Sequence, residues 1–199
     1  MHRETFDHAF SHVQNVSLQY ASDGFVENPL HTTIQLRNLN TDIDSKKTLE
    51  KKSALIVQGH VVDRKQLWNL FETRIQIDHI LKGHAKTFIT LYEPIKIEDG
   101  MICMYGSQIW LKPGLSYQLY LNPVDSQHYN YTHSLFGCFL LKDHLKTYEY
   151  KDSQDNLVIS KKFLDKYDLI HFINKEDKYL SRYEKGYRLY LEIASSLRK

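Results

Sequence analysis

Alternation between apolar and polar residues is the main feature of the chain between Ser53 and Asn122. It is clearest within Leu70–Leu81, where every second residue from Phe71 to Ile77 is apolar or threonine and the residues between them are polar or charged. Because successive side chains point to opposite faces of a β-strand, this period of two predicts a strand with one buried and one solvated face. The phase changes at Ile80, which predicts a bend or bulge there.

Similar patterns predict four further strands, at Ala54–Val62, Thr87–Glu93, Ser116–Asn122 and Phe136–Leu141. Gly59 interrupts the first of them, and a glycine inside a strand often marks a bulge or a sharp bend. The strand at Thr87–Glu93 carries bulky residues on both faces, so we expect both faces to be covered. Turns are predicted at Lys82-Gly83-His84 and at Lys112-Pro113-Gly114, the second as a type II turn.

Helical spacing is found near both ends of the chain. Apolar residues three or four apart between Leu180 and Leu197 predict a C-terminal helix, with Asn174 as its N-cap. The same spacing from Phe6 to Val13 predicts a short helix near the N-terminus. Another short helix is expected around Phe163–Ile170.

Two segments after the fourth strand are assigned from their turn residues. Residues 122–134 are predicted to be loop, and residues 147–160 to be a hairpin with a long turn. The chain is thus interpreted as a lead-in (residues 1–47), a β region (48–160) and a helical segment (161–199) that packs on the β region as part of the same unit.

The composition is that of a soluble globular protein, with 42% hydrophobic and 25% charged residues in 199. The 14 tyrosines and 9 phenylalanines favour pleated, half-buried surfaces and so a mainly β fold. A formal net charge of +2 lacks the basic excess of a dedicated nucleic-acid binder.

No stretch approaches the ~20 apolar residues of a membrane helix. We expect either a cytoplasmic protein or an exported one whose leader has been removed.

Cys103 and Cys138 are the two cysteines. Their number allows one disulfide or two free thiols, and it excludes a metal site built from paired CxxC motifs.

The sequence contains no nucleophile elbow, phosphate-binding loop or dinucleotide-binding fingerprint. We therefore predict no catalytic residue, no metal site and no cofactor.

Two imidazole–carboxylate neighbours are candidates for acid–base chemistry. His60 lies three residues before Asp63, and Asp78 directly precedes His79. Side chains alternate along a strand, so such close neighbours mostly face different ways. A hydrolase with a His/Asp site is accordingly the last of our hypotheses.

The predicted loop contains an unusual cluster formed by His128, Tyr129, Tyr131 and His133. Aromatic loops at the mouth of a small barrel can stack on bases or sugars, or anchor a protein partner. Alternatively, such a loop folds its tyrosines over its own barrel. These four residues are the predicted binding site.

A more specific pattern runs through three stretches of the β region. Its residues are Ala54, Ile56, Val57, Gly59 and Val61; Ile77, Ile80, Leu81, Lys82 and Gly83; and Leu111, Pro113, Gly114, Tyr117, Leu119, Tyr120 and Leu121. In this order they resemble the bacterial relatives of the netrin and tissue-inhibitor-of-metalloproteinase (NTR/TIMP-like) barrel. The resemblance covers residues 48–160, and its motifs are structural glycines and apolar strands.

That resemblance implies an OB-like five-stranded Greek-key β-barrel with the C-terminal helix packed on it. Bacterial members of the family resemble exported or lipid-anchored proteins without an assigned activity. Animal members carry several disulfides and a reactive amino-terminal cysteine, which this chain lacks, so protease inhibition by that route is not supported.

The resulting expectation is a non-enzymatic binding protein with a protein partner or a role in the cell envelope. The alternative is a binder of single-stranded nucleic acid or oligosaccharide on the barrel face. Nucleic acid ranks lower because the candidate basic residues are scattered along the chain. They are Lys82, Lys86, Lys112, Lys142 and Lys146.

Overall fold

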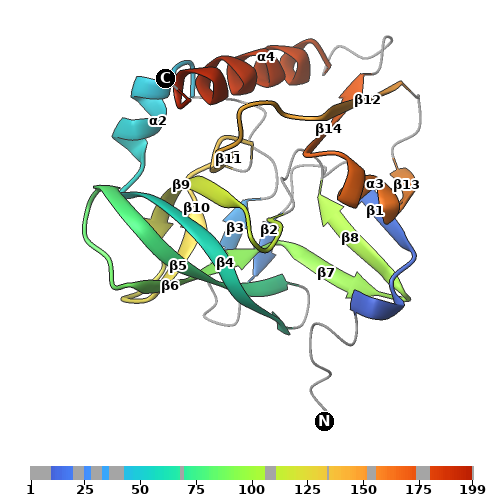
Figure 1. Cartoon of the computed structure of the whole chain (residues 1–199), viewed down its shortest axis with the longest axis horizontal. Coiled ribbons are helices and arrows are strands. Elements are labelled where there is room, and N and C mark those ends of the chain that lie inside the picture. The colour runs from blue at the N-terminus through green and yellow to red at the C-terminus, as the bar shows by residue number, and fades with distance from the viewer. Residues whose placement is uncertain are drawn as a thin grey trace.

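The computed structural model describes residues 10–19, 25–27, 33–35, 43–67, 70–105, 111–133, 135–151, 156–173 and 180–198. The fold is mainly β with a few helices, as the sequence predicted. Two sheets lie beside each other, and the helices α2 (Lys46–Lys52) and α4 (Leu180–Ser196) lie together along one side of the molecule (Figure 1).

Five strands of the larger sheet pair in a cycle. They are β4 (Leu55–Leu67), β5 (Leu70–Lys82), β6 (Phe88–Glu93), β9 (Ser116–Pro123) and β10 (His128–Tyr131). The pairings run from β4 to β5, β6, β10 and β9, and β9 pairs again with β4. All are antiparallel except the pairing of β6 with β10, which is parallel. We call these five strands the ring.

The prediction of an uninterrupted loop over residues 122–134 was wrong, because this segment contains β10. The side chain of Asp125 accepts hydrogen bonds from the N–H groups of Gln127 and His128, at 2.8 Å each. This turn chemistry leads directly into a strand of only four residues, so the turn signal concealed the strand. The predicted fifth strand is present as β11 (Cys138–Leu140), which pairs with β9 and not with β6.

Gly59 marks a bulge in β4, as predicted. The register between β4 and β5 shifts between Gln58 and Gly59, and it shifts again near Ile56, opposite Ile80 and Lys82. A Cβ atom at Gly59 would overlap the carbonyl oxygen of Gln76 on β5. The two strands therefore approach more closely here than a side chain at position 59 would allow.

The second sheet contains a strand from the predicted lead-in. Its order is β13 (Asn156–Ser160), β1 (Asn15–Gln19), β8 (Met101–Tyr105) and β7 (Ile95–Glu98). β1 pairs with β8 in parallel and with β13 in antiparallel orientation. Pro94 separates β6 from β7, so one run of chain serves both sheets.

The hairpin predicted for residues 147–160 was wrong. β12 (Thr147–Lys151) pairs in parallel with β14 (Leu169–Ile173), whereas β13 pairs with β1. β14 also replaces the second half of the helix predicted around Phe163–Ile170, of which only α3 (Lys162–Lys166) is helical. The small hairpin of β2 (Phe25–Glu27) and β3 (Thr33–Gln35) completes the strands.

The C-terminal helix α4 packs against β11, which pairs with β9 of the ring. The aromatic side chain of Tyr190 is fully buried and stacks on that of Phe139 in β11, at 4.6 Å between centroids. Its hydroxyl donates to the carbonyl oxygen of Cys138 at 3.2 Å. The helix predicted at the C-terminus is confirmed, while its predicted cap at Asn174 and most of the predicted N-terminal helix lie outside the described residues.

Gly59→Val is expected to lower the free energy of unfolding by about 3 kcal/mol, because the added side chain meets the backbone of β5 and forces the strands apart. Urea denaturation followed by circular dichroism measures this loss. Val62→Leu is the matched control on the same strand, since Val62 is exposed; its effect should stay within about 0.5 kcal/mol. Equal denaturation midpoints for both variants contradict this account of the bulge.

Candidate functional site

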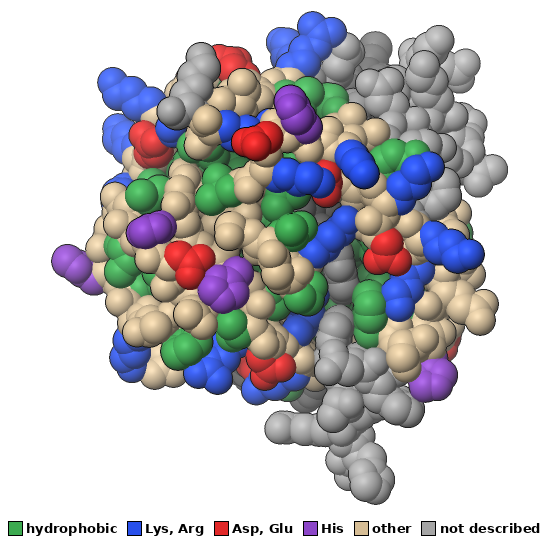
Figure 2. Space-filling model, in the orientation of Figure 1, with side chains coloured by type: hydrophobic (Ala, Val, Ile, Leu, Met, Phe, Trp, Pro, Cys, Tyr) green, Lys and Arg blue, Asp and Glu red, His purple; other side chains and the backbone are tan. Residues whose placement is uncertain are grey.

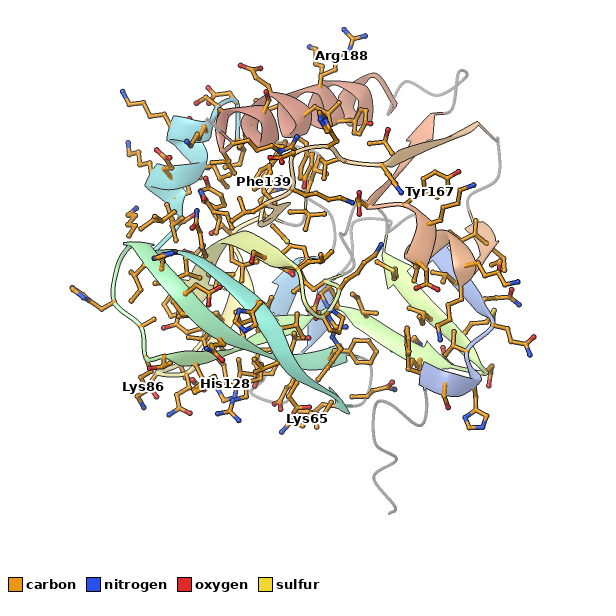
Figure 3. The ribbon with its side chains drawn as sticks, viewed as in Figure 1. Lys65, Lys86, His128, Phe139, Tyr167 and Arg188 are labelled. Atoms are coloured by element: carbon orange, nitrogen blue, oxygen red, sulfur yellow. The ribbon has the colours of Figure 1, made fainter. Side chains whose placement is uncertain are left out.

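A groove with a volume of about 450 Å³ opens where β5, β6 and the residues before β10 meet. It is lined by Arg74 of β5, by residues 86–90 at the start of β6 and by Gln127. Figure 3 shows Lys86 and His128 at the same end of the molecule, near this groove. Only Lys86 among the lining residues was named as a candidate from the sequence.

Arg74 and Phe88 form the centre of the groove. The guanidinium of Arg74 lies 4.3 Å from the centroid of the Phe88 ring, which is the geometry of a cation–π contact. Phe88 remains 38% exposed, so the expectation that both faces of this strand are covered was wrong at this position. The groove therefore offers a partly exposed aromatic ring directly beside a cation.

The positive charges of the groove have no acidic partner in the described part of the chain. The nearby carboxylates are engaged elsewhere: Asp125 pairs with His128 at 2.7 Å, and Glu72 pairs with Lys65. Neither Arg74 nor Lys86 forms an ion pair among the described residues. The groove is therefore locally basic in a chain that is close to neutral.

One edge of β6 is open along the groove. The N–H of Ile77 donates to the carbonyl oxygen of Thr87 at 2.8 Å, and in an antiparallel pair the hydrogen-bonding residues alternate. The N–H and C=O of Phe88 consequently point away from β5. On the side of β6 that faces away from β5, β10 pairs only with Thr90 and Leu91. No described strand pairs with Phe88 on that side.

His128, one of the predicted site residues, borders the groove through its neighbour Gln127. Its ring stacks on Tyr92 of β6 at 5.1 Å, with 5° between the ring planes. The N–H groups of Gln127 and His128 hold the pKa of the Asp125 carboxyl below its usual value. Burial raises the pKa of Tyr92 to about 12, so this hydroxyl stays protonated.

The other three predicted site residues face the interior of their own fold. Tyr129 is 7% exposed and belongs to the main hydrophobic core, and the hydroxyl of Tyr131 lies 3.5 Å from Glu93. The Nδ1 atom of buried His133 accepts the N–H groups of Leu135 and Phe136, at 3.1 and 3.3 Å. The structure thus does not gather the predicted cluster on one surface.

A charged network lies inside the ring. Arg64 of β4 and Glu93 of β6 form an ion pair at 3.2 Å, and their side chains are 3% and 1% exposed. Arg64 also donates to the hydroxyl of Thr73 at 3.0 Å and to the carbonyl oxygen of Leu111 at 2.9 Å. The hydroxyl of Thr73 donates in turn to Glu93. The network therefore joins β4, β5 and β6 to the segment before β9.

Both cysteines are free thiols buried in the protein, which resolves the choice that the sequence left open. Burial, followed by the charge of Glu93, raises the pKa of the Cys138 thiol well above its ordinary value. Burial likewise raises the pKa of Cys103. At neutral pH neither sulfur is poised as a thiolate nucleophile.

The imidazole–carboxylate pair differs from the pairs seen in the sequence. His60 binds Asp78 on the adjacent strand at 3.1 Å, whereas Asp63 accepts the N–H of Arg64 at 2.8 Å. No hydroxyl or thiol of a described residue is hydrogen-bonded to His60.

Within the described ranges there is likewise no group of three residues suited to a metal ion.

Most of the candidate lysines serve structural contacts away from the groove. Lys82 donates to the carbonyl oxygens of Glu50 and Ser53 at the end of α2, at 2.6 Å each. Lys112 donates to the carbonyl oxygen of Tyr167 at 3.0 Å, and Lys142 pairs with Asp168 at 2.9 Å. On the face shown in Figure 2, cations and carboxylates are interspersed.

Comparison with known proteins adds no family assignment. No protein-family model matches the chain, and no curated protein matches it at a significant level of similarity. None of the described helices has the length and apolar character needed to cross a membrane.

Glu93→Ala is expected to lower the free energy of unfolding by about 3–5 kcal/mol, because it leaves the buried Arg64 charge without its partner. Combining Glu93→Leu with Arg64→Met should recover most of this loss, since both charges are then removed. Glu98→Ala is the control, because its ion pair with Lys96 is exposed; it should cost less than about 1 kcal/mol. Equal losses for Glu93→Ala and Glu98→Ala in urea denaturation contradict the importance of the network.

Proposed function

We propose that this chain is a non-enzymatic binding protein with an OB-like, NTR/TIMP-like barrel, and that it holds a protein partner in the groove beside β6. The order of pairing within the ring supports the OB-like interpretation. The first three strands, β4, β5 and β6, pair in succession and are antiparallel. The fifth strand, β10, is parallel to β6, and the fourth, β9, pairs with both β10 and β4. This is the path expected of a five-stranded Greek-key barrel.

The observation that carries the proposal is the groove itself. It combines a partly exposed aromatic ring, two cations that form no ion pair among the described residues, and a stretch of β6 with one edge that no described strand pairs with. In OB-like barrels the second and third strands and the loop between the fourth and fifth form the surface that commonly binds oligonucleotides and oligosaccharides. Here β5, β6 and Gln127 occupy those positions.

A protein partner fits these features better than single-stranded nucleic acid. Backbone phosphates are normally bound by several lysines and arginines along a groove. Among the described residues that line the groove, Arg74 and Lys86 are the cationic ones, and the lysines at positions 82, 112 and 142 are engaged elsewhere. The pair of His60 and Asp78 gives the hydrolase hypothesis a carboxylate-bound imidazole but no attached nucleophile within the described residues.

The proposal is tested by selecting binders from a random-peptide library displayed on phage. Selected peptides should bind the unmodified protein and lose about tenfold or more in affinity for the triple variant Arg74→Ala/Lys86→Ala/Phe88→Ala, because the centre of the site is removed. The control variant is Val158→Ala/Lys162→Ala, at two exposed positions on the second sheet and α3.

Affinities are measured by fluorescence anisotropy, and thermal unfolding of each variant verifies that it is folded. Labelled oligothymidylate is measured in parallel. Peptides that bind the triple variant as tightly as the unmodified protein contradict a site in this groove. Salt-dependent binding of oligothymidylate in the absence of any peptide binding supports the nucleic-acid alternative instead.

A further inference from the structure

The open edge of β6 suggests how a partner would bind. We propose, on the basis of the function proposed above, that the partner contributes an extended acidic segment that pairs with β6 as an added strand. Its carboxylates would then meet Arg74 and Lys86, and an apolar residue between them would pack on Phe88.

The backbone of β6 is suited to this mode of binding. The N–H and C=O of Phe88 point into the side that faces the groove, and β10 begins its pairing only at Thr90. Adding a strand to an exposed edge satisfies both groups, which gives affinity largely independent of side chains. A DNA backbone offers phosphate acceptors for the N–H of Phe88 but no donor for its C=O, whereas RNA has a donor in its 2′-hydroxyl.

The charges of the groove select the chemistry of the added strand. An incoming strand removes Arg74 and Lys86 from part of their water, and burying an unpaired cation is unfavourable. Carboxylates on the incoming segment compensate this cost, whereas a basic segment would add repulsion. The nearby carboxylates of Asp125 and Glu72 bind His128 and Lys65, and among the described residues neither forms an ion pair with Arg74 or Lys86.

The spacing of the acidic residues follows from strand geometry. Side chains on one face of a strand repeat every second residue. Phe88 lies two residues after Lys86, and the guanidinium of Arg74 lies over the Phe88 ring. The N–H of Thr90 already donates to Gln127, so an added strand can follow the edge only as far as Phe88. The expected pattern is therefore an acidic residue beside Lys86, an apolar residue two positions away beside Phe88, and a second acidic residue two positions beyond that, where the segment leaves the edge and its carboxylate meets Arg74.

Cations at a strand edge also have a simpler explanation, since charged residues protect exposed edges against unwanted pairing between molecules. The two explanations differ in their consequences. A protective edge binds no strand of either charge, whereas a binding edge accepts an acidic strand and exchanges its preference when its charges are reversed.

The experiment uses synthetic labelled peptides with glutamate, valine and glutamate at alternate positions, together with a matched peptide in which lysine replaces each glutamate. The acidic peptide should bind the full chain about tenfold or more tightly than the basic peptide. The variant Arg74→Glu/Lys86→Glu should reverse this preference. The matched charge reversal Lys162→Glu/Lys185→Glu, at exposed positions on two helices, should leave it unchanged.

Main-chain pairing is tested separately at Phe88. Phe88→Ala removes the ring and keeps the N–H, whereas Phe88→Pro removes both. Since this N–H faces the groove and not β5, the proline variant should keep its fold, verified by thermal unfolding, and bind the acidic peptide more weakly than the alanine variant.

Three results would overturn the inference: no binding of the acidic peptide, equal binding of both peptides, or an unchanged preference after charge reversal. If peptides from the phage library bind in the groove but lack the acidic pattern, the inference fails while the proposed function stands. If no peptide binds in the groove, both fail. Competition between oligothymidylate and the acidic peptide, with the oligonucleotide bound more tightly, would assign the site to nucleic acid.

Discussion

Arg64 and Glu93 form an ion pair almost entirely shielded from water, and neither charge is tolerated there without the other. Isolated charges in a protein interior are strongly unfavourable, so the pair persists only when further hydrogen bonds satisfy it. Thr73, Tyr131 and the carbonyl oxygen of Leu111 surround it from β5, β10 and the segment before β9. The network thus connects β4, β5, β6 and β10 of the ring with the segment before β9.

The position where β10 begins determines which part of β6 remains open. At the C-terminal end of β6 the side chain of Glu93 is buried in the ion pair, and on the opposite face of the strand the ring of Tyr92 is covered by His128. The first residues of β6 extend beyond the start of β10, and there the groove with Phe88 and Lys86 opens. A buried charge at one end and an edge that no described strand pairs with at the other are thus properties of a single strand. In the proposed mode of binding, an edge that is already extended lowers the entropic cost of adding a strand.

The sequence predicted the parts of the fold that depend on local pattern. The period of two identified β5, and Gly59 identified the bulge in β4, because both signals arise from residues adjacent in the chain. The strands β1 and β14 were missed because their pairing partners lie far away in the sequence and their own patterns are short. The buried network could not be predicted, since Arg64 and Glu93 have the character of solvated residues in a strand pattern.

For the site, the sequence indicated an aromatic cluster but not its orientation. His128 borders the groove, whereas Tyr129, Tyr131 and His133 turn inward, and only tertiary structure distinguishes these cases. The alternation in β5 places Arg74 on the solvated face, and this signal could have identified Arg74 as a candidate binding residue. The exposure of Phe88 depends on where β10 begins, which no local pattern encodes.

The central claim is that the backbone of β6 is available at Phe88 while its neighbours are held by hydrogen bonds. Amide hydrogen exchange of the unbound protein, resolved by residue with nuclear magnetic resonance, measures this directly. The account predicts rapid exchange at Phe88 and slow exchange at Ile89, which faces β5, and at Thr90, whose N–H donates to Gln127. Slow exchange at Phe88, equal to that of these two neighbours, would contradict it.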